Sequence, residues 1–250
     1  MLRLIYFILI LCSFWSCENS LKKSCSNQIE IIRFEQLLFE TNGNSFSKNI
    51  RLLHKEHSTF FDLYFENVIG VKLSNHDSIS YYERIHAFIN HSDIKNLFLD
   101  TQKKFNSITE YERDLNCAFD FLNQEFPQIK TPYVYTFLSA LNLASFTYNG
   151  YLGVGIDLFL GKDYEHYPNS GHPQYLINDF EEKNLTTWAL KTHFNESFPL
   201  NNINNANLLD HMIHEGKKIY LLSLSLPEKK ESDILSFSQE QFDWCSSNER

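Results

Sequence analysis

The sequence predicts an α+β fold, namely a single, mostly α-helical domain with a small central sheet. Three observations lead to this class. Apolar residues recur at helical spacing in several segments of the 250-residue chain. One stretch, residues 133–160, is instead rich in β-branched and aromatic residues and is interrupted by glycines. Hydrophobic residues make up 43% of the chain against only eight Gly and six Pro, which supports a sizeable core and excludes a disordered or collagen-like chain.

The amino terminus has the pattern of an export signal. Arg3 precedes a short apolar run that is about half the roughly 20 residues of a membrane-spanning helix. The run ends in Phe14-Trp15-Ser16-Cys17, which resembles the lipobox of bacterial lipoproteins. We therefore expect a signal peptide over residues 1–16 and lipid attachment at Cys17. The alternatives are an ordinary secretory signal cut elsewhere and an uncleaved anchor.

The segment after Cys17 predicts a tether followed by a helical first half. Residues 17–27 are polar after the lipidated cysteine, and residues 28–250 form the globular domain. Helical patterns cover residues 46–61, 80–89 and 93–105. The clearest helix begins with a capping-box pattern at Ser107-Ile108-Thr109-Glu110 and ends before Pro127. Its apolar face consists of Tyr111, Leu115, Ala118, Phe119, Leu122 and Phe126.

The second half of the domain begins with the predicted sheet. Residues 133–138 and 145–160 provide two or three strands. Helices then follow over residues 174–180 and 185–194, and a long one runs from about Asn207 to Leu226, where Pro227 stops it. A last short helix is expected within residues 232–244. No repeat or second linker divides this region, so one domain is expected.

Charge and cysteine content exclude several classes of protein. Twenty-two basic and 31 acidic residues give a net charge of −9, which repels phosphate backbones, so no nucleic-acid partner is expected. Of the five cysteines, removal of Cys12 with the signal and lipidation of Cys17 leave three. An odd number argues against a disulfide framework, although one bridge stays open. No spacing indicates a structural zinc site.

Candidate metal ligands lie in the long helix after residue 207. His211, His214 and Glu215 stand at i, i+3 and i+4 and therefore share a face, and His172 could join them from a loop. Imidazole and carboxylate are zinc ligands. The order differs from both HExxH and HxxEH, however, so no general base stands where those motifs place it. The alternative is a solvated polar face in which Glu215 pairs with Lys218.

Other polar residues have structural interpretations. Asp157 lies among apolar residues, so a buried carboxylate there needs a partner, and a helix cap or a structural hydrogen bond would supply one. No GxSxG, Walker A or other complete catalytic motif is present, which favours a protein without enzymatic activity and without a cofactor. The remaining candidate histidines are expected to face solvent: His54, His57, His76, His86, His91 and His193.

Three segments resemble the gliding motility lipoprotein GldB family of Bacteroidota. They are residues 153–164, with Leu160-Gly161-Lys162-Asp163-Tyr164, residues 208–220, with Met212-Ile213 and Glu215-Gly216-Lys217-Lys218, and residues 237–249, with Trp244-Cys245. His172 stands where the family has an aromatic residue. Family members usually continue beyond the last segment, so the resemblance implies a domain truncated at its C-terminus.

The resemblance implies a lipid-anchored component of the cell envelope, on the periplasmic side, that gliding motility and the associated type IX secretion require. Such a protein acts through protein partners and brings no catalytic residue or cofactor. The segment around Glu215-Gly216 is also similar to zincin-type peptidases, whose HExxH is missing from this chain. A degenerate zincin-like scaffold accommodates both resemblances. The alternative function is a metallohydrolase with an atypical site built from His211, His214, Glu215 and His172.

Overall fold

A computed structural model describes residue 25 and residues 29–43, 45–71, 79–200 and 205–248. The predicted signal peptide, Cys17 and most of the predicted tether lie outside these residues. None of the described helices is both long enough and apolar enough to span a bilayer.

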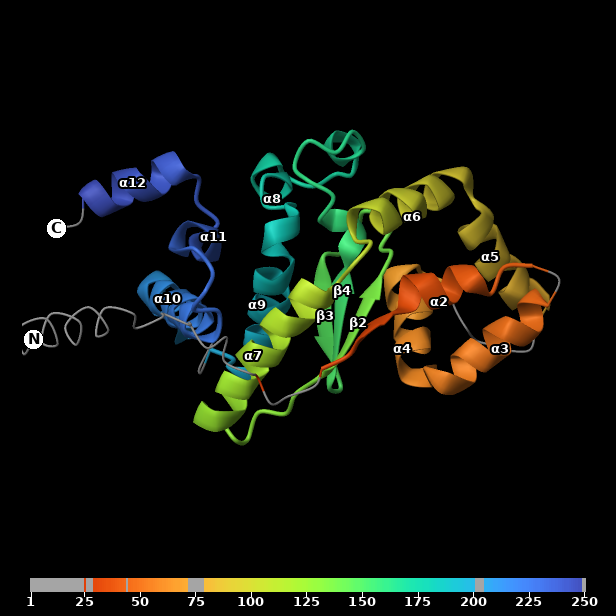
Figure 1. The fold of residues 1–250 in the computed structure, drawn as a ribbon, viewed down its shortest axis with the longest axis horizontal. Coiled ribbons are helices and arrows are strands. Elements are labelled where there is room, and N and C mark those ends of the chain that lie inside the picture. The colour runs from red at the N-terminus through yellow and green to blue at the C-terminus, as the bar shows by residue number, and fades with distance from the viewer. Residues whose placement is uncertain (1–24, 26–28, 44, 72–78, 201–204, 249–250) are drawn as a thin grey trace, which may run out of the picture.

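A mixed four-stranded sheet lies at the centre of the domain (Figure 1). The strand order is β1 (Ile31–Arg33), β2 (Tyr133–Phe137), β4 (Tyr151–Gly155) and β3 (Ser145–Tyr148). The first three are parallel, and β3 pairs antiparallel with β4 at the edge. Asn149 and Gly150, both at positive φ, connect β3 to β4, as expected for a two-residue hairpin turn. The predicted small sheet is confirmed, with β1 as an unpredicted addition.

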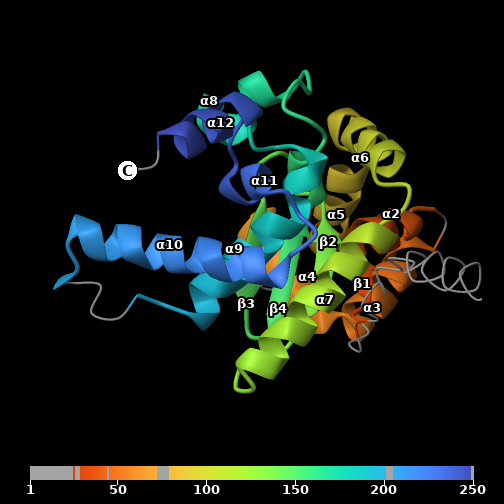
Figure 2. The ribbon, with the colours of Figure 1, turned by 60° about the vertical axis from the view of Figure 1, so that its left-hand side comes forward.

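Helices cover both faces of the sheet (Figures 1 and 2). On one side, α7 and α9 share a hydrophobic cluster with Val134 and Leu152, and α10 packs on these two helices. On the other side, α2 and α4 share a cluster with Tyr135 and Phe137. The mostly helical α+β class is therefore confirmed. The α-helices are α2 (Phe34–Glu40), α3 (Phe46–Glu56), α4 (Ser58–Leu63), α5 (Ile79–Asn90), α6 (Ser92–Lys104), α7 (Thr109–Glu125), α8 (Gln174–Ile177), α9 (Leu185–Ser197), α10 (Leu208–Ser225), α11 (Glu231–Leu235) and α12 (Gln239–Ser247).

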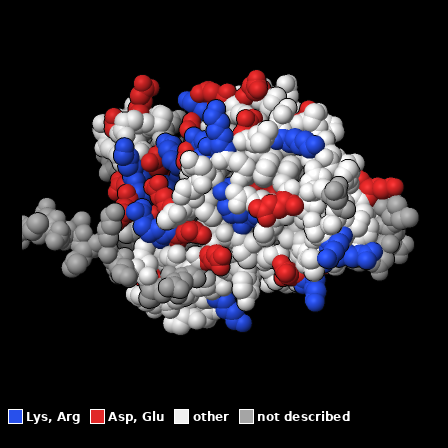
Figure 3. Space-filling model, turned by 45° about the vertical axis from the view of Figure 1, so that its right-hand side comes forward, with Lys and Arg blue, Asp and Glu red and all other residues white. Residues whose placement is uncertain are grey.

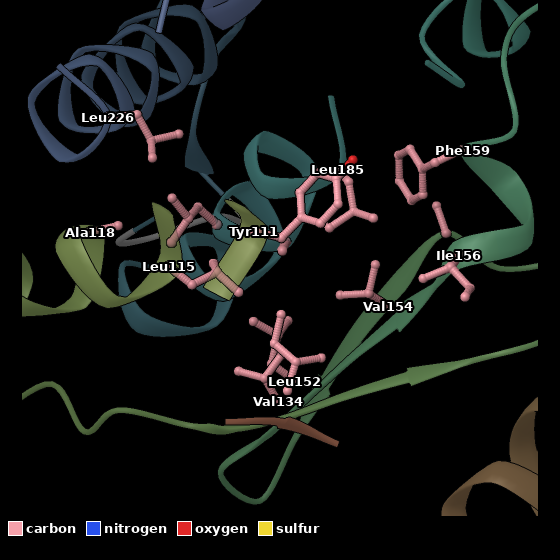
Figure 4. Close-up of a cluster of buried hydrophobic side chains, with 14 of the residues drawn as sticks. Tyr111, Leu115, Ala118, Val134, Leu152, Val154, Ile156, Phe159, Leu185 and Leu226 are labelled. Carbon is pink, nitrogen blue, oxygen red and sulfur yellow. The ribbon is translucent and has the colours of Figure 1, made fainter. Parts of the chain in front are cut away.

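The side chains of β2 alternate between two hydrophobic clusters because successive residues of a strand point to opposite faces. Val134 lies in the cluster beneath α7, whereas Tyr135 and Phe137 lie in the cluster beneath α2 and α4. Figure 4 shows the first cluster, in which Leu115 of α7 and Leu185 of α9 converge on the strands. Because both faces of the strand are buried, β2 consists of apolar and aromatic residues apart from Thr136.

The predicted apolar face of α7 is correct, but its predicted capping box is not. Five of the six predicted side chains are buried, and Phe126 is partly buried at the helix end. The helix begins at Thr109, with Ile108 in the N-cap position. Ser107 Oγ accepts a hydrogen bond from the Thr109 N–H at 3.4 Å and not from the residue a capping box needs, since the helix starts one residue too late. Capping boxes are present at α10 and α12 instead.

Two predicted helices are each divided in the structure. Residues 46–61 form α3 and α4, which meet at His57, where the backbone leaves the helical region. Residues 232–244 fall into α11 and α12, because Ser236 adopts a left-handed conformation with φ of 57°. Neither break involves Gly or Pro, the residues that usually mark a helix end in a sequence.

Candidate functional site

Helix α10 carries three of the four candidate metal ligands. A capping box between Asn207 and Asp210 begins the helix. His211 is exposed and His214 is partly buried. Glu215 is exposed, and its Oε1 lies 2.6 Å from the Nζ of Lys218, the ion pair expected from the solvated-face interpretation.

His172, the fourth candidate, has a different role. Its Nε2 lies 2.9 Å from the carbonyl oxygen of Leu141, and its ring meets the Phe180 ring edge-on. Across the part of the chain that the structure describes, no three His, Cys, Asp or Glu side chains are placed to hold a metal ion together. The structure therefore gives the metallohydrolase alternative no assembled site.

Asp157 carries a fully buried carboxylate in the sheet region. It follows β4 and accepts hydrogen bonds from the N–H groups of Ser139 at 2.9 Å and Leu141 at 2.7 Å, and from the Ser139 hydroxyl. Burial raises the pKa of Asp157 to about 6, although these hydrogen bonds lower it in part. The expected structural hydrogen bonds are thus present.

The loop that Asp157 holds is strained. Ala140 and Leu141 have φ of 57° and 60°, a conformation that residues with a Cβ rarely adopt. Asp157 from one side and His172 from the other fix this loop at the end of β2. The Ser139 hydroxyl donates to the Asp157 carboxylate and accepts from the Asn142 N–H, and the side chain is only 1% exposed, so these bonds hold it inside the protein. We conclude that this polar cluster has a structural role.

The histidine predictions are partly wrong. His193 is buried on α9 against the Phe119 ring, and burial lowers its pKa to about 4. Its Nε2 lies 3.2 Å from Ser197 Oγ, and the rest of the ring is enclosed because most sides of α9 contact the core. His57 is partly buried and bonded to the Tyr135 hydroxyl at 2.9 Å, and His54 is also partly buried. His86 and His91 are exposed as expected, and His76 lies outside the described residues.

A large apolar surface lies on the side of α10 that faces away from the core. We call it the outer face, and it consists of Leu209, Met212, Ile213, Tyr220 and Leu224, each between 42% and 66% exposed. Leu209, Ile213, Tyr220 and Leu224 share one helical face, and Met212 lies at the edge of that face. The opposite side of the helix, with Leu222 and Ser225, is buried. Figure 2 shows the first half of α10 extending away from the body.

A cleft adjoins the end of the outer face. It lies between α7 and the α10–α11 connection, has a volume of about 740 Å³, and includes Leu224 in its wall. Two ion pairs cross the cleft: Lys104 Nζ lies 2.7 Å from Glu182, and Lys183 Nζ lies 2.6 Å from Asp233. The Glu182 carboxylate also accepts a hydrogen bond from the Tyr111 hydroxyl. On the face drawn in Figure 3, acidic and basic side chains are intermixed.

A disulfide bond forms part of the cleft wall. Cys25 is joined to Cys117 of α7, with 5.0 Å between their Cα atoms. The single bridge that the sequence leaves open is therefore formed, and Cys245 is an exposed free thiol. The bond attaches the predicted tether to the domain at Cys25, three residues before residue 28, where the domain is predicted to begin. Sequence reasoning missed both the outer face and the cleft, because both depend on which side of α10 packs on the core.

Comparison with known proteins gives one finding. The family model described as gliding motility protein GldB matches residues 16–250, which is nearly the whole chain. No curated protein and no solved structure matches it. The match spans the sheet, the cleft and α10, and it includes the three segments whose residues resemble this family. On this evidence the chain belongs to the gliding motility protein GldB family.

Proposed function

We propose that this chain is a membrane-anchored lipoprotein that gliding motility and the associated type IX secretion require, and that it acts through contacts with protein partners. The family match supports the role in gliding. The residues before Cys17 support an export signal and a lipid anchor, which we assign to the periplasmic side of a cell-envelope membrane. No step of this function needs a cofactor or a catalytic residue.

The observation that carries the contact function is the outer face of α10. Its five apolar side chains are exposed together, on a helix of which only the C-terminal half packs on the core. Taking about 200 Å² for each side chain, they expose on the order of 500 Å², near the upper end of the largest patch on a typical monomer. Such a patch is expected to be covered by a partner.

The proposed anchor would keep the domain close to the membrane. Cys17 and the disulfide-bonded Cys25 are eight residues apart, so the segment between them reaches at most about 28 Å. Each buried methylene of an acyl chain contributes about 0.8 kcal/mol to membrane binding, which makes attachment through several chains firm. The domain is therefore held within reach of partners in the same membrane.

Complementation of a deletion strain tests this function. We expect the deletion to abolish colony spreading and surface-protein secretion, and the wild-type gene to restore both. A gene with Met212→Glu and Ile213→Glu should fail to restore them, whereas Leu99→Glu, which charges an equally exposed leucine on α6, should restore them fully. Normal spreading of the deletion strain would contradict the proposed function, and full activity of the double variant would contradict the role of the outer face.

A further inference from the structure

The cleft between α7 and the α10–α11 connection contains Lys229, which forms no ion pair with any residue that the structure describes. Pro227 ends α10, and the turn that follows, in which the Lys229 N–H donates to the Leu226 carbonyl at 3.0 Å, directs Lys229 to the cleft. Within the described residues, Lys229 makes no ion pair or side-chain hydrogen bond. Three other basic residues of the cleft are already paired with carboxylates: Lys104 with Glu182, Lys183 with Asp233 and Arg113 with Asp114.

The environment of Lys229 favours an added carboxylate. The side chain is partly buried, and burial lowers the pKa of its amine, while the more distant carboxylates of Asp114, Asp233 and Glu110 act in the opposite direction. The side chain is only partly buried, so its ammonium group stays open to a ligand. A carboxylate oxygen would give this group a charged hydrogen-bond acceptor that no described side chain supplies.

The rest of the cleft defines what else the ligand carries. Leu224, Leu226, Pro227 and Phe121 provide apolar wall beside the disulfide, and the volume of about 740 Å³ is within the range of ligand sites. Seven acidic and five basic residues line the cleft, so its net charge is 5 − 7 = −2. A phosphate or an anionic lipid surface is repelled by such a charge, whereas a segment with one carboxylate and flanking cations is not.

We propose that the cleft binds an extended peptide segment of a protein partner, in which one Asp or Glu side chain reaches Lys229. An apolar neighbour in the segment covers Leu226 and Phe121, and basic residues meet Glu110 and Glu228 at the rim. The inference rests on the proposed function, because it specifies the chemistry of the partner. Leu224 belongs both to the cleft and to the outer face, so one partner can cover both surfaces.

Nuclear magnetic resonance on the purified full-length chain tests the proposal. The lysines are ¹³C-methylated, and the Lys229 signal is assigned with Lys229→Arg. The probe is the peptide acetyl-Lys-Leu-Asp-Leu-Lys-amide, with its Asn counterpart, a Glu version and versions with Val or Phe in place of Leu. We expect the Asp and Glu peptides to shift the Lys229 signal and the Asn peptide to bind at least tenfold more weakly.

Matched variants separate charge from structure. Lys229→Met should weaken binding of the Asp peptide at least tenfold. Lys229→Arg, and Lys130→Met at an exposed lysine outside the cleft lining, should each change the affinity less than threefold. Thermal unfolding of each variant shows whether it is folded. If Lys229→Met does not fold, Lys229→Gln takes its place, and the same loss of affinity for the Asp peptide is expected.

Three results would overturn the proposal: equal affinity for the Asp and Asn peptides, no shift of the Lys229 signal with any peptide of the set, or a shift with phosphatidylglycerol micelles in place of the peptides. These results concern purified protein and leave the gliding role standing. Conversely, normal spreading of the deletion strain refutes the gliding role and leaves peptide binding in the cleft intact.

Discussion

Cys25 and Cys117 are covalently joined although 92 residues separate them in the sequence. The bond connects the segment that follows the predicted lipid anchor to the middle of α7, upstream of the three-residue edge strand β1. Force applied at the anchor is therefore transmitted to α7 through the disulfide before it reaches β1. The bond is thus a connection between the anchor and the core helix that faces the cleft.

Removal of this bond should destabilise the domain. For a loop of this length, the chain entropy that the cross-link removes from the unfolded state corresponds to about 4.6 kcal/mol. We expect Cys25→Ser with Cys117→Ser to lower the free energy of unfolding by about 3–5 kcal/mol in urea titrations. Cys245→Ser is the control and should leave it unchanged, since that thiol is exposed and free. An identical unfolding midpoint with and without dithiothreitol would contradict the prediction.

Asp157 should make the domain less stable as the pH rises. Burial raises its pKa from 3.8 to about 6, so the folded state keeps the proton in a range where the unfolded state has lost it. The free energy of unfolding should therefore fall between about pH 4 and pH 6, by about 3 kcal/mol from this group. Asp157→Asn removes this slope. The measurement is the difference in unfolding free energy between wild type and variant across that range, and a constant difference would refute it.

His193 should act in the opposite direction over an overlapping range. Burial lowers its pKa from 6.5 to about 4, so the unfolded state binds a proton that the folded state excludes. The contribution of His193 to the free energy of unfolding is complete above about pH 6.5 and falls by about 3 kcal/mol as the pH drops toward 4. Comparing wild type with His193→Leu isolates this term. Because the two slopes partly cancel in the wild type, each variant should show a steeper pH dependence than the parent chain, and parallel curves would disprove the assignment.

The predicted lipid anchor can be tested directly. Cys17→Ala should abolish incorporation of an alkyne-labelled fatty acid and move the protein from the membrane to the soluble fraction. Cys245→Ser, which changes another cysteine outside the disulfide, should alter neither. Retained labelling of the Cys17→Ala protein would show that the acceptor is a different residue.

Local signals in the sequence predicted the elements that depend on local patterns. The face of α7 repeats at helical spacing from Tyr111 to Leu122, and the strands beside Gly153 carry β-branched and aromatic residues. Strand β1 was missed because three residues give no period, and its pairing with β2 joins positions about a hundred residues apart. The burial of His193 was missed because α9 is enclosed on most sides, which no polar pattern within the helix reveals.

The candidate site depended even more on tertiary structure. The spacing of His211 and Glu215 correctly placed them on one helix, but only the fold shows that His172 instead binds the carbonyl of Leu141. Lys229 has no signal in the sequence, since it becomes notable only when residues from α7 and α11 enclose it. The same holds for Ile213, which is exposed because the first half of α10 extends away from the body of the domain.

Opposite sides of α10 should therefore respond differently to substitution. Leu222 is fully buried, so Leu222→Ala should lower the free energy of unfolding by about 2–5 kcal/mol. Ile213→Glu lies on the outer face, where the free energy of unfolding is expected to change by no more than about 0.5 kcal/mol.

Colony spreading should show a different pattern, because the outer face is needed for the partner. Ile213→Glu should reduce spreading at unchanged protein level, whereas Leu222→Ala should reduce it only as far as it lowers the amount of folded protein. Chemical unfolding, and immunoblots alongside the spreading assay, measure the two effects. If Ile213→Glu is both destabilised and inactive, this side of α10 serves folding and not binding.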